Sequence, residues 1–277
     1  MTLYFTKMHG LGNDFIVIDA IRQSVNLTRA RIAMLSKRDT GIGFDQCLLI
    51  EASRAADCDF FYRIFNADGQ EVGQCGNGAR CLARFVHYYQ LTDKKAITVA
   101  TKTTRMQLHI NPDDTVTVNM GKPQLLPEKI PLNRMALQPV YSLPLDNEST
   151  CEFHAINVGN PHAVLITDHI AEAPVTDLGR FICEHPLFPE QTNVGFMQIQ
   201  NAESIALRVY ERGCGETRAC GSGAVAAAAV GRLYHGLGET VKVDLPGGSL
   251  LVFWPDVQKD IFLTGPAAFV YEGKILC

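Results

Sequence analysis

The chain lacks any apolar run of about 18 residues, the length that a membrane-spanning helix requires. Its longest apolar tract, AVAAAAV at residues 224–230, is far shorter. The segment MTLYFTKMHGLGNDF has no apolar core of the kind found in signal peptides. Basic residues are not in excess, because 25 Lys and Arg stand against 29 Asp and Glu, for a net charge of −4. We therefore expect a cytoplasmic protein with no membrane and no nucleic-acid partner.

Features of cofactor and metal sites are also scarce. No lysine lies in a context that suggests a pyridoxal Schiff base. The nine cysteines are odd in number and follow no secretion signal, so we expect reduced thiols. Cys75/Cys81 and Cys214/Cys220 each show C-x₅-C spacing, whereas structural zinc favours about two to four intervening residues. We therefore expect neither metal nor cofactor, and keep a metal-binding or redox module as an alternative that metal analysis would test. The cysteines expected to act only as small buried hydrophobes are Cys47, Cys58, Cys81, Cys151 and Cys183.

The sequence contains two copies of one unit. RIFNADGQEVGQCGNGA begins at Arg63, and RVYERGCGETRACGSGA begins at Arg208, 145 residues later (208 − 63). Each copy runs from Arg-aliphatic-aromatic to Cys-Gly-x-Gly-Ala. Upstream, GNDFIVID at Gly12 aligns with GNPHAVLIT at Gly159, an offset of 147 (159 − 12). These ordered matches indicate an internal duplication.

The hydrophobic patterns predict an α+β fold. We expect two pseudo-symmetric domains, each a mixed, largely antiparallel β-sheet or barrel wrapped around a central helix. Residues 1–120 form the first, joined by a C-terminal strand at 266–277, and residues 121–265 form the second. The proline-rich region 121–150 is the best linker candidate. Helices are predicted at 28–37, 77–90, 174–184 and 221–235. Strands are predicted at 15–19, 59–65, 96–100, 105–110, 115–119, 152–157, 162–167, 195–200, 204–210, 240–245, 249–254 and 260–264.

Each copy places a cysteine at the start of a predicted helix, namely Cys75 and Cys220. A helix N-terminus offers unpaired N–H groups and partial positive charge, which favour a bound carboxylate and a thiolate. Two such ends facing one another would place an α-carbon between two thiols. One thiolate could then remove the α-proton from one face while the other thiol delivers a proton to the opposite face. This two-base scheme inverts a carbon centre without a cofactor.

Each half also offers the same ordered set of polar residues for substrate recognition. Amides hydrogen-bond without competing as bases. Arg212 can bind a carboxylate bidentately, and Glu211 can pair with an ammonium group. His162 matches Phe15 in the first half, so it breaks the pseudo-symmetry and could tune one cysteine. The set comprises Asn13, Gln46 and Asn66 in the first half, and Asn160, Asn193 and Glu211 in the second.

Three segments resemble the diaminopimelate epimerase family. They are KMHGLGNDF at Lys7–Phe15, NADGQEVGQCGNGAR at Asn66–Arg80 and ERGCGETRACGSGA at Glu211–Ala224. The resemblance covers the whole chain and implies interconversion of LL- and meso-diaminopimelate in bacterial lysine and peptidoglycan biosynthesis. It implies Cys75 and Cys220 as the acid/base pair, His162 and Glu211 as modulators of their pKa, and a homodimer with Tyr271 at its contact. The implied substrate contacts are Asn13, Gln46, Asn66, Gly76, Asn77, Asn160, Asn193, Glu211, Arg212, Gly221 and Ser222.

Two other functions remain open at this point. A proline racemase-like enzyme would share the two-thiol chemistry, but its substrate has one ring and one carboxylate. The Glu211-Arg212 pair and the many amides favour a longer substrate with a second amino-acid end. A pure amino-acid-binding protein would have no use for two cysteines at helix ends.

Overall fold

The computed structural model describes residues 2–53, 55–73, 76–145 and 149–276. The chain divides into two compact units. Unit 1 comprises Met1–Asn119 with Gly265–Cys277, and unit 2 comprises Met120–Thr264. Strands dominate both units and helices are few, so the predicted α+β class is confirmed. Within the described ranges, no helix is long and apolar enough to cross a membrane.

All four predicted α-helices are confirmed, and every predicted end lies within two residues of the observed end. Helix α1 has an N-cap, Thr28, whose hydroxyl accepts a hydrogen bond from the Arg31 amide. Two short 3₁₀ helices, Pro127–Lys129 and Ile170–Glu172, supplement the four. The α-helices are α1 (Arg29–Leu35), α2 (Gly76–Tyr88), α3 (Val175–Glu184) and α4 (Gly221–Tyr234).

The strands of unit 1 come from both ends of the sequence, because the last strand joins the first ones. They are β1 (Thr2–Gly10), β2 (Asn13–Asp19), β3 (Gln46–Ala52), β4 (Phe60–Asn66), β5 (Glu71–Val72), β6 (Ala96–Ala100), β7 (Arg105–Ile110), β8 (Val116–Asn119) and β18 (Ala268–Leu276).

The strands of unit 2 follow one another in an uninterrupted stretch of chain. They are β9 (Tyr141–Pro144), β10 (Thr150–Asn157), β11 (Pro161–Ile166), β12 (Asn193–Asn201), β13 (Ser204–Glu211), β14 (Gly215–Thr217), β15 (Thr240–Leu245), β16 (Gly248–Phe253) and β17 (Phe262–Gly265).

The two units share one strand topology, which confirms their pseudo-symmetry. Unit 1 runs β18-β1-β2-β3-β4-β6-β7-β8, with β5 added to β4. Unit 2 runs β9-β10-β11-β12-β13-β15-β16-β17, with β14 added to β13. In each run the third-to-fourth and fifth-to-sixth strand pairs are parallel and the others are antiparallel.

The pairing register is also shared. Phe15 pairs with Gln46 in unit 1, and His162 pairs with Asn193 in unit 2. Both pairs are related by the offset of 147 seen in the sequence (162 − 15 and 193 − 46). Since a slip of one residue would turn every side chain to the other face, this agreement places equivalent side chains on equivalent faces.

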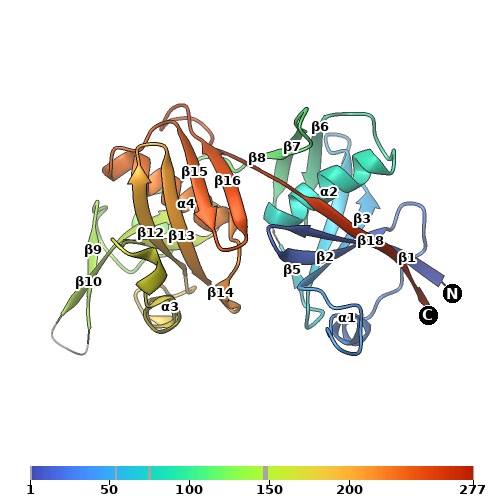
Figure 1. The fold of residues 1–277 in the computed structure, drawn as a ribbon, viewed down its shortest axis with the longest axis horizontal. Coiled ribbons are helices and arrows are strands. Elements are labelled where there is room, and N and C mark those ends of the chain that lie inside the picture. Colours follow the sequence, from blue (N-terminus) through green and yellow to red (C-terminus); the bar gives the residue numbers. More distant parts are fainter. Residues whose placement is uncertain (1, 54, 74–75, 146–148, 277) are drawn as a thin grey trace. The chain divides into compact units, whose positions relative to one another are not determined.

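Each unit surrounds one helix with its strands, as the ribbon of Figure 1 shows for α2 and α4. Helix α2 contacts β1, β2, β3, β7 and β8, and α4 contacts β10, β11, β12, β13, β15 and β16. Helix α4 is buried from Gly223 through Gly231, as expected for a helix that is apolar on nearly all sides. Its small residues, chiefly alanine, let the surrounding strands approach closely.

Two expectations about the second half need correction. The region 121–150 is not a linker, because Ile130, Leu132, Tyr141 and Leu143 belong to the buried core of unit 2. Pro127 begins a 3₁₀ helix and Pro144 ends a strand, and both positions tolerate the missing N–H. The sequence patterns also missed β1, β3, β5, β9 and β14. Of these, β5 and β14 are too short to show a period.

A histidine pair joins β10 to the end of α4. His154 Nδ1 donates to the Pro139 carbonyl at 2.6 Å, so its Nε2 accepts from His235 Nε2 at 2.8 Å. The ring of Tyr234 stacks on His154. Burial lowers the pKa of both imidazoles. An unfolded histidine has a pKa of about 6.5. At a pH just below this value, the folded protein therefore binds fewer protons than the unfolded chain.

The stabilising contribution of this pair is full above that pKa and is lost as the pH falls. In His235→Gln, the amide can still donate to His154 but does not titrate. We expect the free energy of unfolding to fall less steeply between about pH 7 and pH 5, since each proton taken up on unfolding adds about 1.4 kcal/mol per pH unit. Urea unfolding across this range measures the slope. Parallel curves for variant and wild type would contradict the assignment.

Candidate active site

In unit 2, a row of polar residues crosses three neighbouring strands at one edge. His162 on β11 pairs with Asn193, the first residue of β12. The next ladder pair is Val194 with Tyr210, so Asn193 and Glu211 come together where β12 begins and β13 ends. Asn160 precedes β11 at the same edge and lies 3.2 Å from His162 through its Oδ1. The fold thus assembles four of the predicted residues.

Cys220 lies at the end of this row as the N-cap of α4. Its Sγ accepts from the Gly223 amide at 3.4 Å and lies 3.6 Å from Ser222 Oγ. A Cβ on Gly223 would come within 3.0 Å of Val209 and 3.3 Å of the Cys220 sulfur. Glycine at 223 therefore allows the helix amide to approach the sulfur. Gly221, also predicted, is the first residue of the helix.

The thiol of Cys220 has a carboxylate partner. Its Sγ donates to Glu211 Oε2 at 3.0 Å. Burial raises the pKa of Cys220 well above its ordinary value, and the charge and hydrogen bond of Glu211 raise it further, while Ser222 and the Gly223 amide lower it. The helix N-terminus thus lowers the pKa of Cys220, as expected, but burial and Glu211 raise it by more. Burial and the neighbouring carboxylate therefore favour the protonated thiol over the thiolate at Cys220.

Glu211 is itself held on both carboxylate oxygens. Thr217 Oγ1 donates to Oε1 at 2.5 Å, while Cys220 donates to Oε2. Burial raises the pKa of Glu211, and these two hydrogen bonds oppose the shift. The half-buried Glu211 and the buried Cys220 thus form a couple that can share one proton.

Asn193, Arg212 and His162 complete this half. The Asn193 carbonyl oxygen accepts from the Arg212 amide at 2.9 Å, and the Arg212 guanidinium donates to the Glu190 carbonyl at 2.6 Å. His162 is fully buried, and its Nδ1 has no partner among the described residues. Burial, and next the charge of Arg212, lower the pKa of His162 to about 3. His162 is therefore neutral near pH 7.

Unit 1 assembles the matching amides. Gln46 Nε2 donates to Asn66 Oδ1 at 2.9 Å, where Gln46 and Asn66 are ladder partners on β3 and β4. Asn13 accepts from Asn77 Nδ2 at 3.1 Å and donates to Asp45 at 3.0 Å. These hydrogen bonds fix the orientation of the amides, leaving the buried Gln46 Oε1 as an acceptor without a partner in the described chain.

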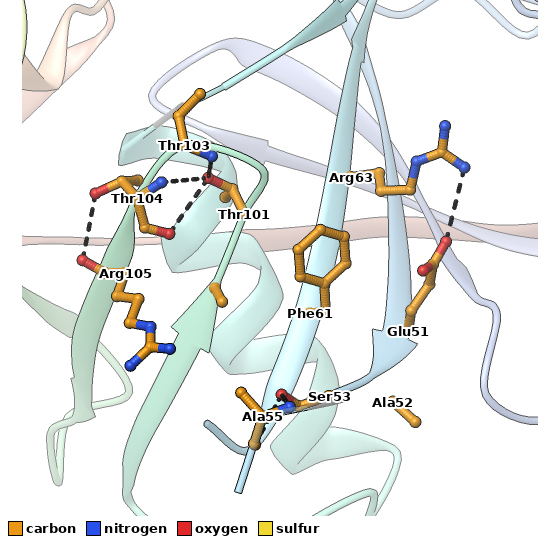
Figure 2. Close-up of a pocket in the computed structure, with 11 residues that line it drawn as sticks. Glu51, Ala52, Ser53, Ala55, Phe61, Arg63, Thr101, Thr103, Thr104 and Arg105 are labelled. Carbon is orange, nitrogen blue, oxygen red and sulfur yellow. Dashed lines mark hydrogen bonds and ion pairs between the residues drawn. The ribbon is translucent and has the colours of Figure 1, made fainter. Parts of the chain in front are cut away.

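Cys75 lies outside the described residues, but both sides of it are described. Gly76 begins α2, and a Cβ there would meet nothing within 4 Å among the residues that the structure describes, its chain neighbours aside. On the other side, the Gly73 carbonyl accepts from the hydroxyls of Thr101 and Thr103 in the β6–β7 turn, at 2.5 and 2.9 Å. Figure 2 shows this turn, with the Thr101 hydroxyl at its centre.

Unit 2 makes an equivalent contact with different chemistry. The Arg218 carbonyl, two residues before Cys220, accepts from the Gly247 amide in the β15–β16 turn at 2.8 Å. Gly73 lies at the same distance before Cys75 in the sequence. In both halves, the hairpin that follows the central helix therefore anchors the segment that leads into the cysteine.

A cavity of about 770 Å³ in unit 1 lies apart from the predicted residues (Figure 2). Its charged side chains are already paired. Arg63 binds Glu71 at 2.8 Å and lies 3.8 Å from Glu51, and Arg105 binds Asp57. None of the predicted substrate contacts lines it, so we do not assign it to the active site.

Sequence reasoning missed three residues that orient the predicted ones. Thr217 holds Glu211, Asp45 holds Asn13, and the fully buried Arg80 donates to Asn77 Oδ1 at 2.9 Å. Arg80 and Thr217 lie inside the segments that carried the family resemblance. For Thr217 a further signal was available, because its counterpart is Val72 (217 − 145), a break in pseudo-symmetry like that of His162 and Phe15.

Comparison with known proteins identifies the family of this chain. The family model described as diaminopimelate epimerase matches residues 5–126 and 154–270. A diaminopimelate epimerase from Legionella pneumophila (strain Corby) is 63% identical over 276 residues, covering 100% of both chains. A relative from the Paris strain, with the same printed name, is equally similar.

Solved structures share the fold at low identity. A hydroxyproline epimerase from Agrobacterium vitis superposes with a TM-score of 0.71 at 12% identity, covering 99% of this chain and 92% of that one. A PhzF-family phenazine biosynthesis protein from Bacillus anthracis gives 0.68 at 14% identity over 100% of both chains. Because the family model covers most of the sequence and close relatives cover all of it, this chain belongs to the diaminopimelate epimerase family.

Proposed function

We propose that this epimerase interconverts LL-2,6-diaminopimelate and meso-diaminopimelate with Cys75 and Cys220 as its two bases and with no cofactor. The name of the family and of its relatives supports the substrate. The observation that carries the mechanism is the Cys220 thiol, which caps a buried helix and lies 3.0 Å from Glu211. Such a thiol can donate its proton, and the adjacent Glu211 can hold that proton when the sulfur does not.

The reaction requires one thiolate and one thiol at the same time. In one direction, the Cys75 thiolate removes the α-proton and the Cys220 thiol delivers a proton to the opposite face of the carbon. The products are the inverted substrate, a Cys75 thiol and a Cys220 thiolate. In the reverse direction the roles exchange. Cys220 can serve in both, because its proton can pass to Glu211, whose pKa burial raises, while the Gly223 amide stabilises the thiolate.

The helix ends and amides supply recognition. The N-termini of α2 and α4 would bind the carboxylate at the reacting carbon and stabilise the charge that develops when the α-proton leaves. Arg212 and the amides would bind the distal amino-acid end of the substrate. The proposed contacts are Asn13, Gln46, Asn66, Gly76, Asn77, Asn160, Asn193, Glu211, Arg212, Gly221 and Ser222.

This activity would serve bacterial lysine and peptidoglycan precursor synthesis, and we place it in the cytoplasm, where thiols stay reduced. The cysteines expected to be buried hydrophobes, Cys47, Cys58, Cys81, Cys151 and Cys183, are buried.

Substituting either catalytic cysteine should abolish epimerisation. A serine hydroxyl is a far weaker base than a thiolate, so Cys75→Ser and Cys220→Ser should each lower kcat by roughly 10²–10⁴-fold. The assay follows conversion of LL- to meso-diaminopimelate and α-proton exchange in D₂O without added cofactor. Cys214→Ser, at an exposed cysteine in the same motif, is the matched control and should stay active. Near-normal turnover by either catalytic variant would refute the two-base assignment.

Glu211 should set the ionisation of Cys220. In Glu211→Gln, the negative charge that raises the pKa of the thiol is absent, so Cys220 should ionise at lower pH. The ¹³Cβ shift of labelled cysteine, assigned through Cys220→Ser, follows this titration without substrate. Epimerisation should nevertheless fall, because the amide cannot accept the proton. An unchanged or higher titration midpoint would contradict the coupling.

We further propose that the enzyme is a homodimer that uses the face around Tyr271. This side chain is 45% exposed on β18, and its ring meets Phe5 edge-on at 6.0 Å. Tyr4, Tyr88 and Val270, also in unit 1, are exposed as well. The Tyr88 ring packs against Phe269 of β18 at 4.7 Å, and contiguous exposed apolar side chains of this kind are typical of an interface.

Replacing the tyrosine should weaken the dimer. Tyr271→Ala is expected to shift the mass measured by light scattering toward the monomer at low micromolar protein. Phe253→Ala, which removes a similarly exposed aromatic ring from β16 in unit 2, should leave the mass unchanged. If both variants keep the wild-type mass, Tyr271 is not at the contact.

A further inference from the structure

Thr217 stands outside every predicted contact, yet it holds one of the two oxygens of Glu211. A threonine hydroxyl has a single hydrogen to donate. Here it is directed at Glu211 Oε1, while the Cys220 thiol is directed at Oε2. The carboxylate therefore lies between two donors, one of which belongs to the reacting group. With Oε1 engaged by Thr217, Oε2 is the oxygen turned toward the sulfur.

The duplicated fold supplies an internal comparison. Thr217 pairs with Val209 across β13 and β14, and Val72 pairs with Ile64 across β4 and β5. Val72 is thus the structural counterpart of Thr217. Valine and threonine have nearly the same shape, so this strand position does not require a hydroxyl. The counterpart of Glu211 is Asn66 (211 − 145), which cannot ionise. The hydroxyl occurs only in the half that carries the carboxylate.

We propose that Thr217 is a positioning residue of the epimerase, whose hydroxyl fixes Glu211 with one oxygen toward the Cys220 sulfur and determines which of the two holds their shared proton. This inference rests on the proposed role of Cys220. A hydrogen bond donated to a carboxylate favours its ionised form. With the Thr217 bond, the proton stays on sulfur and Cys220 is ready to act as the acid. Without it, the buried carboxyl group takes the proton and Cys220 becomes a thiolate before substrate arrives.

The other polar and charged groups near Glu211 do not replace this hydroxyl. On β11 and β12, His162 is neutral, and Asn193 is an amide whose oxygen is bound to the Arg212 amide. The Arg212 side chain reaches the Glu190 carbonyl, and Arg208 on β13 is paired with Glu216 at 2.7 Å. From α4, the groups are Cys220 itself and Ser222, which contacts the sulfur. The pKa of Glu211 is shifted by burial, which raises it, and by the hydrogen bonds from Thr217 and Cys220, which lower it.

Three substitutions separate the hydroxyl from the rest of the side chain. Thr217→Val keeps the shape and removes the hydroxyl, Thr217→Ser keeps the hydroxyl, and Thr217→Ala removes both hydroxyl and methyl. We expect Val and Ala to lower kcat by about tenfold or more, as for loss of a hydrogen bond to a buried charged group, with KM changed little. Ser should retain kcat within about threefold. If Thr217→Val does not fold, the difference in kcat between Thr217→Ser and Thr217→Ala tests the role of the hydroxyl instead.

Two measurements report on the proton rather than on folding. The ¹³Cβ signal of Cys220, recorded without substrate, should show a larger thiolate fraction at neutral pH in the Val and Ala variants and a wild-type fraction in Ser. The acid limb of the kcat profile should move to higher pH in Val and Ala. Wild-type titration of Cys220 and an unshifted profile in Thr217→Val would overturn the proposal, as would a Ser variant as impaired as Ala.

These outcomes are independent of the test of the proposed function. The thiol titration needs no turnover, so it remains informative even if Cys220→Ser keeps its activity and the two-base mechanism fails. A changed titration with unchanged kcat in Thr217→Val would overturn the role of Thr217 in the reaction while leaving the proposed bases intact.

Discussion

Unit 2 depends on the burial of one apolar helix, α4, whose N-terminus lies at a polar site. Helix α4 can be surrounded by strands only because its residues are small and apolar, and a buried helix still has amide groups at its N-terminus that need partners. Cys220 satisfies one of them, and the Gly223 position lets the sulfur come close. The same arrangement that completes the helix therefore exposes a thiol to a donor-rich helix end. In this unit, folding and chemistry share the same few atoms.

Burial also explains why the site needs a carboxylate. A thiol removed from water resists ionisation, and a second buried acid resists it too. Placed 3.0 Å apart, Cys220 and Glu211 can exchange a single proton at little cost, since the pair keeps the same total charge in either arrangement. The equivalent place in unit 1 holds Asn66, so only one half of the duplicated fold carries this couple. Nearly the same backbone fold thus carries chemically different polar residues in the two units.

Much of this could be predicted because the information was local and repeated. The Cys-Gly-x-Gly segments marked both helix starts, and the offsets of 145 and 147 anticipated the shared register, including the pairing of His162 with Asn193. The rest depended on contacts between distant segments. The joining of the C-terminal strand to unit 1 was expected, but no pattern in the sequence shows that Ile130, Leu132, Tyr141 and Leu143 belong to the core of unit 2. The helix end predicted a stabilised thiolate, but the local sequence does not show the burial and the Glu211 charge that oppose this effect at Cys220.

The return of β18 has a consequence for the nascent chain. Unit 2 is continuous, so all its strands have been synthesised once residue 264 has been added. Unit 1 is not, because β1 pairs with β18 and Ile275 contributes to its core cluster beside Leu3 and Ile16. Until β18 has left the ribosome, β1 keeps one unpaired edge, which is a site for mispairing. The domain whose synthesis starts first is therefore the last to be completed, after the other can already have folded.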